Sequence, residues 1–439
     1  MHHASRPAPR RRPALFLSRW AVLPDPWSLL IVGASARSAA YSTRRAGGRP
    51  SCVDLFADRD LAAICPSARL SPRDYPDGLA RLAAEAPRSP WMYTGALENH
   101  PELVDRIAGS RPLWGNDGAI LRAVRDPIAV AESLCGAGLP CPRVRLSPVG
   151  LPRDGSWLVK PHASAGGRGV QPLVPSSKPA RVPSYYQERV AGPSLSALFI
   201  GDRSGASLCG VTRQWVGRGG SPFAYRGSLG PWPVSDREAA RIGLLGGFLA
   251  ASYRLVGLFG VDFILSDGQP WPVEINPRYT ASVEILELAL RRSLLAEHRR
   301  ACELTGGECG RPSSPLPPGE GARRAGEGLR LGGENSPAAP PGTLVVGKII
   351  LFASARCHLP DLDRWEPEDS PPPFTVPRLG DIPHPGTIFE AGDPVMTLFA
   401  LGRSPATCRA RLRHAHDSWE RRMLRVPGGR QDERDRGKA

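Results

Sequence analysis

The first apolar run that predicts a secondary-structure element is SLLIV at Ser28–Val32. A short, continuous apolar run is typical of a buried parallel strand. A turn of small residues from Gly33 predicts the start of a helix, and a second strand is predicted at Ser51–Leu55, with Asp54 near its carboxyl end. This order predicts a doubly wound α/β domain. Because the full GxGxxG pattern is absent, a Rossmann-like scaffold is favoured over a dinucleotide site.

Past Leu146 the pattern changes, because apolar runs of strand length follow one another with few helical segments between them. This pattern predicts an α+β unit with antiparallel character. Before that boundary we expect a strand and loop at Trp91–Asn99 and a helix at Ile120–Leu139. The strands expected after it are Ser156–Lys160, Ser184–Val190, Leu208–Val216, Gly257–Leu265 and Trp271–Ile275, and the helices are Ser235–Leu255 and Ser282–Arg300.

The periodicity disappears in residues 311–342, where Pro, Gly, Ala, Arg and Glu dominate, and returns in an apolar strand at Thr343–Ala353. A segment without apolar periodicity cannot bury enough surface to order itself, so a disordered insertion in a surface loop is predicted. The expected parts are a disordered basic arm at 1–27, a Rossmann-like domain at 28–145, an α+β domain at 146–305, the low-complexity insertion at 306–342, a C-terminal α/β region at 343–425 and a disordered tail at 426–439.

Composition narrows the class of protein. The 439 residues are 41% hydrophobic, which allows roughly two to four domains with cores of their own. The nine cysteines form no CxxC pair and no zinc-type spacing with histidine, which favours a reducing, cytoplasmic setting without a structural metal. No apolar run reaches about 18 residues, so neither a membrane-spanning helix nor a membrane partner is expected.

Much of the net charge of +15 lies near the chain ends. Residues 403–438 alone carry 11 basic and 5 acidic residues. A basic tail of this kind is more often a solvated surface than a nucleic-acid site, so nucleic acid is not the favoured partner. Only four of the 57 basic residues are lysines, which makes a lysine beside a glycine-rich loop a sharper signal than usual.

One such lysine, Lys160, ends a predicted strand and precedes the glycine-rich segment SAGGRG at Ser164–Gly169. Its glycines Gly166, Gly167 and Gly169 allow positive φ and a close approach of the backbone, and their amides can surround phosphate oxygens. The lysine can add a point charge to the α- and β-phosphates. The segment lacks the Walker A pattern GxxxxGK[ST], and on its own an ordinary glycine turn explains it equally well.

The strand predicted at Ser184–Val190 contains Gln187 and Glu188. A strand that ends in Gln-Glu suits a hinge between two lobes, where its backbone contacts the adenine edge and apolar neighbours cover the ring. A plain edge strand is an equally good interpretation of these residues alone.

A group of three oxygen ligands is predicted in two neighbouring strands. Asp262 lies in an apolar strand, and Glu274 and Asn276 follow twelve and fourteen residues later. A period of two places Glu274 and Asn276 on one face, and Asp262 joins them if the strands pair. Two carboxylates and an amide oxygen are hard ligands that suit Mg²⁺ or Mn²⁺. Because buried acids are costly without a cation, a metal site is favoured over a structural role. Arg278, after a Pro-fixed turn, can clamp a phosphoryl or carboxylate group.

This series of motifs resembles the ATP-grasp superfamily, and within it the biotin carboxylase-like branch and a group of predicted ATP-dependent ligases or carboligases. The strand GVDF at 260–263 followed by VEINPR at 273–278 is its most specific part. The resemblance implies a fold of mixed α/β and α+β class. A Rossmann-like pre-ATP-grasp domain is followed by an ATP-grasp fold of two α+β lobes, which carries the disordered insertion and is completed by the C-terminal region.

The resemblance also implies an activity. An ATP- and Mg²⁺-dependent ligase activates a small carboxylate as an acyl phosphate, and an amine or similar nucleophile displaces phosphate to form, most typically, a carbon–nitrogen bond. The implied ATP contacts are Lys160, Ser164, Gly166, Gly167, Gly169, Gln187, Glu188, Val190 and Ser194; the implied metal ligands are Asp262, Glu274 and Asn276; Arg278, Arg213 and Arg226 are implied to steady the acyl phosphate; and Glu98, Asn99 and Tyr225 are candidates for the acceptor pocket. A homodimer is the expected assembly.

Two family positions differ in this chain. The second ATP-binding lysine of many members is absent, so Arg122 or Arg125 is expected to replace it, and Ser194 stands where many members have an acid that contacts ribose. Two alternatives stay open, an ATP-dependent carboxylase that uses bicarbonate and a nucleic-acid-binding or regulatory protein that uses the basic ends. Since some ATP-grasp ligases serve tetrahydromethanopterin synthesis, that cofactor pathway is one setting for the enzyme.

Overall fold

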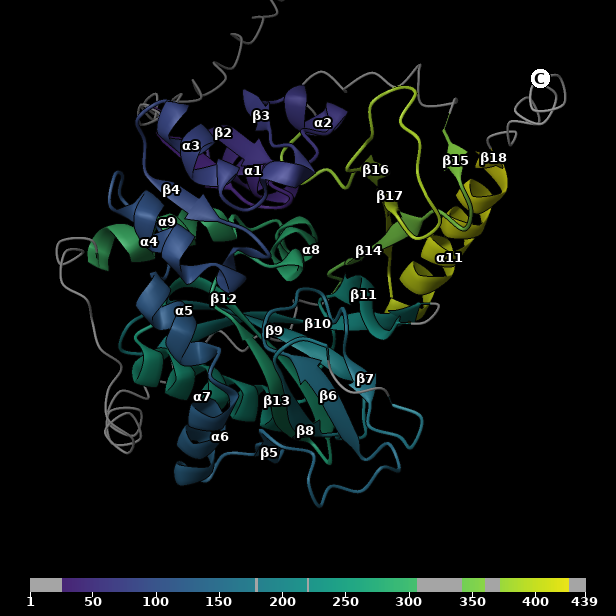
Figure 1. Cartoon of the computed structure of the whole chain (residues 1–439). Coiled ribbons are helices and arrows are strands. Elements are labelled where there is room, and N and C mark those ends of the chain that lie inside the picture. Colours follow the sequence, from purple (N-terminus) through teal and green to yellow (C-terminus); the bar gives the residue numbers. More distant parts are fainter. Residues whose placement is uncertain (1–25, 178–180, 219–220, 306–341, 360–371, 426–439) are drawn as a thin grey trace, which may run out of the picture.

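The computed structural model describes residues 26–177, 181–218, 221–305, 342–359 and 372–425. The arm, insertion and tail expected to be disordered lie outside these residues, apart from residues 26, 27 and 342 at their edges. Figure 1 shows the N-terminal domain at the top, a large sheet below it, a smaller sheet at the bottom and helix α11 (Pro405–Arg422) along one side.

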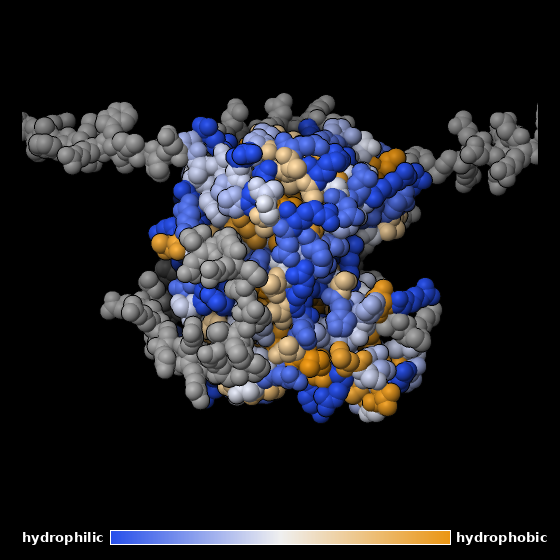
Figure 2. Space-filling view, turned by 60° about the vertical axis from the view of Figure 1, so that its left-hand side comes forward, coloured by the Kyte–Doolittle hydropathy of each residue, from blue (hydrophilic) through white to orange (hydrophobic). Residues whose placement is uncertain are grey.

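Among the described residues, no helix has the length and apolar character needed to cross a membrane. The face shown in Figure 2 is largely hydrophilic, with small apolar patches between the charged regions.

The N-terminal domain is built on a four-stranded parallel sheet in the order β3-β2-β1-β4. Its elements are β1 (Ser28–Val32), α1 (Arg37–Arg45), β2 (Arg49–Asp54), α2 (Arg59–Ala62), β3 (Ser67–Arg69), η1 (Pro72–Asp74), α3 (Gly78–Glu85), β4 (Trp91–Tyr93), η2 (Leu97–Asn99) and α4 (Pro101–Ala108). The last four residues of β1 are completely buried, which explains why this strand is a continuous apolar run. The doubly wound beginning expected from SLLIV is present.

The segment expected as one helix at Ile120–Leu139 is two helices, α5 (Gly118–Val124) and α6 (Pro127–Gly136). Pro127 has no amide hydrogen to continue the first helix. The Asp126 carboxylate instead caps α6, accepting the backbone N–H groups of residues 128 and 129 at 3.0 Å each. The expectation of a single helix is therefore wrong at this Asp-Pro step.

A small lobe follows, whose four-stranded sheet has the order β5-β8-β6-β7. Its strands are β5 (Val144–Arg145), β6 (Trp157–Pro161), β7 (Gln171–Pro172) and β8 (Ser184–Glu188), and every neighbouring pair is antiparallel. This sheet lies beside one end of the large sheet in Figure 1.

The large sheet has eight strands in the order β13-β12-β9-β10-β11-β14-β17-β16, with all neighbours antiparallel. The strands are β9 (Ser194–Asp202), β10 (Ala206–Arg218), β11 (Ser221–Gly230), β12 (Val256–Ser266), β13 (Gln269–Asn276), β14 (Val345–Phe352), β16 (Leu379–Gly380) and β17 (Pro394–Gly402). Because β11 pairs with β14, strands on both sides of residues 306–341 share one sheet. The sequence did not predict β9 and β11, since polar residues interrupt their apolar runs.

Helices cover both faces of the large sheet. Helix α7 (Asp236–Tyr253) packs on one face, while α8 (Ala281–Leu290) and α9 (Leu294–Thr305) lie on the other, between the sheet and the N-terminal domain. The single helix expected at Ser282–Arg300 is wrong, because Arg291 takes a left-handed φ of +52° and closes α8. A two-stranded sheet of β15 (Cys357–His358) and β18 (Leu424–Arg425) completes the described chain.

Candidate active site

The predicted metal ligands meet at the β12–β13 end of the large sheet. Asp262 lies opposite Glu274, and Gly260 lies opposite Asn276. Gln214 Nε2 donates a hydrogen bond to Asp262 Oδ1 at 3.0 Å, and Asn276 Nδ2 donates one to Asp262 Oδ2 at 3.3 Å. The structure therefore brings the three oxygen-bearing side chains together, while their role as metal ligands stays a prediction.

The two carboxylates of this group are not balanced by an equally close cation. Burial and then the neighbouring Glu274 raise the pKa of Asp262 to about 6. The contact nearest to an ion pair for Glu274 is with Arg125, whose Nη1 lies 3.9 Å from Glu274 Oε1. A divalent cation would supply the missing positive charge, and carboxylate and amide oxygens are the donors that Mg²⁺ prefers. The residues present therefore fit a magnesium ion.

Arg278 is held from the N-terminal domain. Its guanidinium forms a two-pronged ion pair with Glu98, with Nε donating to Oε2 at 2.8 Å and Nη2 donating to Oε1. Burial would raise the pKa of Glu98, but the charge and hydrogen bonds of Arg278 hold it below its ordinary value. Arg278 Nη2 also donates to Asn276 Oδ1 at 2.9 Å. Glu98, expected in the acceptor pocket, thus fixes the orientation of Arg278.

Lys160 connects the two lobes. It ends β6 in the small lobe, and its Nζ donates to the backbone oxygen of Val273 on β13 at 2.8 Å and to Gln187 Oε1 at 3.0 Å. The ammonium also lies 5.6 Å from the centre of the Tyr185 ring. Because Val273 precedes Glu274, the lysine charge lies beside the predicted metal ligands, where it can meet phosphate oxygens.

The glycine-rich loop packs on the start of β11. Gly166, Gly167 and Gly169 have φ of +60°, +71° and +77°, a region that favours glycine. A Cβ at Gly167 would lie 2.1 Å from the backbone oxygen of Phe223, so no side chain fits there. The backbone N–H of Tyr225 donates to the Gly166 oxygen at 2.9 Å, and Asn99 Nδ2 donates to the Ser164 oxygen at 3.3 Å. The glycines therefore permit the close docking of this loop.

The predicted hinge residues are brought to the junction of the lobes but point in different directions. Gln187 is buried and faces Lys160, whereas the Glu188 carboxylate forms an ion pair with Arg143 at 2.8 Å. Val190 is half-buried. Ser194 Oγ donates to Gln214 Oε1 at 3.0 Å, which connects it to Asp262 through one side chain. Their contacts with a nucleotide stay predictions.

The two arginines expected beside Arg278 are placed differently. Thr212 Oγ1 bonds Ser282 on α8, and Gln214 bonds Asp262, so the intervening Arg213 points to the opposite face of β10. There its guanidinium lies 5.1 Å from the centre of the Trp232 ring. The structure therefore does not bring Arg213 to the site, because strand alternation turns it away.

Arg226 occupies the irregularity where the β10–β11 register shifts, between the paired residues Tyr225 and Gly227. Its Nε is buried and has no hydrogen-bond partner within the described protein. Its assignment to the acyl phosphate stays a prediction.

Of the two arginines expected to replace the missing lysine, the structure brings only Arg125 to the site. Arg125 Nη2 donates to the backbone oxygen of His162 at 2.6 Å, beside its contact with Glu274. Arg122 is exposed and forms ion pairs with Glu102 and Asp105, both at 3.2 Å.

Sequence reasoning missed two residues that position Asp262. Gln214 on β10 donates to it, and Ser196 on β9 bonds it and lies opposite it in the register. The only signal in the sequence is the pair of serines two positions apart, Ser194 and Ser196, at the start of an apolar run. That spacing marks one face of a strand, but β9 was not predicted.

Comparisons with known proteins indicate the type of domain that contains these residues. Residues 124–282 match the family model of the ATP-grasp domain. An uncharacterized protein of Methanocaldococcus jannaschii is 30% identical over 114 residues, which are 26% of this chain and 27% of that protein. The match thus spans about a quarter of the length of that relative.

Solved structures with a similar fold cover most of this chain. The biotin carboxylase domain of a 2-oxoglutarate carboxylase from Hydrogenobacter thermophilus, crystallised as a dimer with MgADP, ADP and bicarbonate, has a TM-score of 0.62 at 12% identity over 88% of this chain and 89% of that one. N5-carboxyaminoimidazole ribonucleotide synthetase in complex with ADP has a TM-score of 0.59 at 15% identity over 90% and 98%. The L-amino acid ligase from Bacillus licheniformis has a TM-score of 0.59 at 14% identity over 89% and 97%.

Residues 124–282 therefore match an ATP-grasp domain, and the chain has a fold similar to that of biotin carboxylase. The ATP-grasp domain and the fold class expected from the motifs are confirmed.

Proposed function

We propose that this protein is an ATP- and Mg²⁺-dependent ligase that activates a small carboxylate as an acyl phosphate and joins it to an amine or similar nucleophile. The observation that carries the proposal is the convergence of Asp262, Glu274 and Asn276 between Lys160 and Arg278. Two acids in need of a cation, flanked by two fixed cations, suit a metal-bound triphosphate and the transferred phosphoryl group. The ATP-grasp domain match and the ADP complexes of proteins with this fold support this proposal.

The residues of the site act by binding and orientation. When bound, Mg²⁺ neutralises charge on the phosphates of ATP. Lys160, at the lobe junction, adds a positive charge on the phosphates, and the Ser164–Gly169 loop covers them. A substrate carboxylate oxygen attacks the γ-phosphorus and ADP leaves. Arg278, oriented by Glu98, steadies the acyl phosphate by hydrogen bonds.

The second half of the reaction forms the product bond. The nucleophile's nitrogen attacks the carbonyl carbon, phosphate leaves, and the nitrogen loses its proton to solvent or to the departing phosphate. No residue of the chain needs to act as a general base, because positioning and charge neutralisation lower the barrier.

An ATP-dependent carboxylase that uses bicarbonate is the second candidate. The similarity in fold to a carboxylase domain crystallised with bicarbonate favours it. Both activities pass through an acyl phosphate, so only the substrates separate them. If the enzyme is a ligase of tetrahydromethanopterin synthesis, its substrate is a carboxylate intermediate of that pathway. Such intermediates therefore belong in the same substrate screen.

The test is ADP release from ATP and Mg²⁺, screened against carboxylates and amines with and without bicarbonate. A ligase requires one carboxylate and one amine in bicarbonate-free buffer, whereas a carboxylase requires bicarbonate. Glu274→Gln is expected to abolish the turnover and Glu102→Gln, an exposed acid away from the site, to leave it unchanged. Unchanged turnover in Glu274→Gln would contradict the assignment of the site.

A homodimer is part of the proposal, supported by the dimeric carboxylase domain of the same fold. Sedimentation equilibrium of the full chain tests it, and a monomer at all concentrations up to those used for the assay contradicts it.

A further inference from the structure

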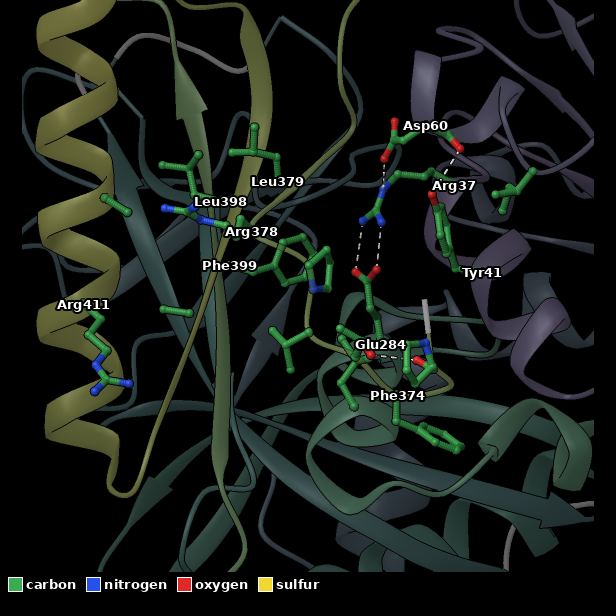
Figure 3. Close-up of a pocket in the computed structure, with 18 of the residues that line it drawn as sticks. Arg37, Tyr41, Asp60, Glu284, Phe374, Arg378, Leu379, Leu398, Phe399 and Arg411 are labelled. Carbon is green, nitrogen blue, oxygen red and sulfur yellow. Dashed lines mark hydrogen bonds and ion pairs between the residues drawn. The ribbon is translucent and has the colours of Figure 1, made fainter. Parts of the chain in front are cut away.

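A large cavity lies away from the candidate ATP site. It has a volume of about 1140 Å³ and opens between α1, β17 and α11 (Figure 3). None of the residues assigned above to ATP, metal or acyl phosphate lines it. This volume is slightly larger than the roughly 300–1,000 Å³ that small-molecule sites enclose. The cavity is therefore large enough to hold a ligand of its own.

The floor of the cavity is apolar. Leu398 and Phe399 of β17 are buried, and Leu379 of β16 is half-buried beside them. The half-buried Phe374 and Val376 add apolar surface from the segment that leads into β16. A ligand that buried an apolar body on these five side chains would gain binding free energy from the hydrophobic effect.

The rim of the cavity is cationic. Arg44 comes from α1, Arg378 from the segment before β16, and Arg411 and Arg422 from α11, and all four side chains are exposed. Within the parts of the chain that the structure describes, none of the four forms an ion pair with a carboxylate. The guanidinium of Arg411 donates a hydrogen bond to the backbone oxygen of Leu401 at 2.8 Å. These charges remain available to an anion.

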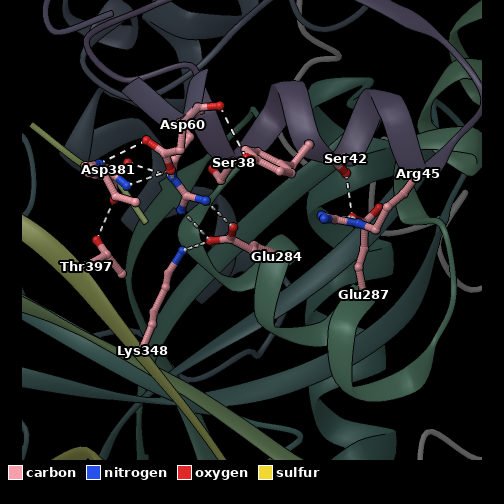
Figure 4. A network of polar contacts seen from close by, with 12 residues as sticks. Ser38, Ser42, Arg45, Asp60, Glu284, Glu287, Lys348, Asp381 and Thr397 are labelled. Atoms are coloured by element: carbon pink, nitrogen blue, oxygen red, sulfur yellow. Dashed lines mark hydrogen bonds and ion pairs between the residues drawn. The ribbon is translucent and has the colours of Figure 1, made fainter. Parts of the chain in front are cut away.

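The two acids that line the cavity do not neutralise this rim. Glu284 is buried and accepts hydrogen bonds from Arg37 Nη1 at 2.9 Å and Lys348 Nζ at 2.8 Å. Asp60 is buried, lies 3.6 Å from Arg37 Nε, and accepts the backbone N–H groups of residues 381 and 382 at 3.0 and 2.9 Å. Figure 4 shows both carboxylates turned into this network. The charge that the cavity presents to a ligand is therefore positive.

We propose that this cavity is a second ligand site, which binds a small molecule with an apolar body and at least two negative charges from carboxylate or phosphate groups. Because the floor is apolar, the cavity is expected to bind such a ligand more tightly than a simple inorganic anion. Because the rim carries arginines, it is expected to bind the ligand more tightly than a neutral apolar molecule. Arginine side chains from three elements suit the recognition of more than one anionic group. The site does not depend on the activity proposed above.

The probe for this site is bis-ANS, a dianionic aromatic dye, titrated by fluorescence into the full chain with excess MgADP present to occupy the ATP site. Arg378→Glu combined with Arg411→Glu reverses two rim charges. Arg413→Glu is the matched control, because Arg413 is exposed on the same helix but does not line the cavity. The double variant is expected to weaken binding roughly tenfold or more and the control to leave it unchanged, with a shallower salt dependence in the double variant.

Competition by other ligands and the thermal stability of the variants are measured as controls. The uncharged analogue N-phenylnaphthylamine and inorganic pyrophosphate are each expected to compete only weakly, because each lacks one half of the required chemistry. Melting temperatures of the variants within about 2 °C of the unsubstituted protein establish that the fold is intact. Full displacement by pyrophosphate alone, an equal loss in Arg413→Glu, or no binding of bis-ANS would overturn the proposal. The proposal would also be overturned if the protein formed a dimer that excluded bis-ANS and if the double variant were monomeric. A second copy of the chain would then occupy the cavity.

Discussion

Two carboxylate centres, one buried around Glu284 and one half-buried around Asp262, lie on the same polar face of the large sheet, and their charges are balanced in opposite ways. At the first, Glu284 receives Arg37 and Lys348, and although burial would raise its pKa, these cations lower it to about 2. At the second, Asp262 faces another acid, Glu274, and burial and that neighbour raise its pKa to about 6. Ser228 joins the two regions, since it lies opposite Gln214 on one side and Lys348 on the other.

This difference in charge balance indicates that the Glu284 centre has a structural role and the Asp262 centre a functional one. The Glu284 centre has its cations within the protein, and they come from the N-terminal domain and from β14, so the centre fixes the arrangement of the domains (Figure 4). At the Asp262 centre the nearest ion-pair contact is the 3.9 Å distance between Arg125 Nη1 and Glu274 Oε1. A carboxylate pair whose charge the protein does not neutralise is a candidate functional site.

The largest expected effect comes from breaking the balanced centre. Glu284→Gln leaves the buried Lys348 without its carboxylate and Arg37 with only Asp60 and Asp381, which is expected to cost about 3–5 kcal/mol of unfolding free energy. Chemical denaturation of the full chain measures it. A loss below about 1 kcal/mol would show that the network does not hold the domains together.

The next effect is on activity rather than stability. Asp262→Asn removes the charge of a proposed metal ligand without changing the shape of the side chain, and is expected to lower ADP release at least about 100-fold. The unfolding free energy without metal is expected to stay the same or rise, because a half-buried acid without a full counter-charge has been removed. If Asp262→Asn were destabilised but had normal turnover, the Asp262 centre would have a structural role and the proposed catalytic role would be contradicted.

A smaller effect is expected where Glu98 orients Arg278. Glu98→Gln keeps the size of the side chain but removes the charge that fixes the guanidinium, so kcat is expected to fall roughly tenfold with little change in the KM for ATP. Steady-state kinetics with the substrates found in the screen measure both. A change confined to the KM for ATP would place Arg278 on the nucleotide rather than on the acyl phosphate.

The smallest effect is the pH dependence of the unbalanced centre. The pKa of Asp262 is about 6 in the folded chain against an ordinary value of 3.8, so the folded state binds this proton more tightly. The resulting stabilisation is complete below the ordinary value and is lost as pH rises through about 6. In EDTA, the melting temperature of Asp262→Asn relative to the unsubstituted protein should therefore rise over roughly pH 4 to 6. Magnesium with ADP should shrink that difference, and a difference independent of pH would contradict the raised pKa.

The sequence predicted what depends on short separations along the chain. Glu274 and Asn276 share a strand face, and Asp262 joins them through a single turn, so the alternation of strand residues was enough to group them. The first βαβ unit was predicted for the same reason, from one apolar strand and the small-residue turn after it.

Contacts set by strand order and register could not be predicted. Gln214 reaches Asp262 only because β9 lies between β12 and β10, and the sequence did not reveal β9. Arg213 was assigned to the site although its neighbours in β10 turn it to the other face. The ion pair between Glu98 and Arg278 joins residues 180 positions apart, and no local pattern encodes such a pairing.

The most direct test of the central claim is the binding of Mn²⁺, as a spectroscopic substitute for Mg²⁺, in the presence of a non-hydrolysable ATP analogue. Electron paramagnetic resonance measures free and bound Mn²⁺ for the unsubstituted protein, Glu274→Gln and the control Glu102→Gln. We expect one tightly bound ion per chain, an affinity at least about tenfold weaker in Glu274→Gln, and no change in the control. Equal affinity in all three proteins would contradict the assignment of Asp262, Glu274 and Asn276 as the metal site.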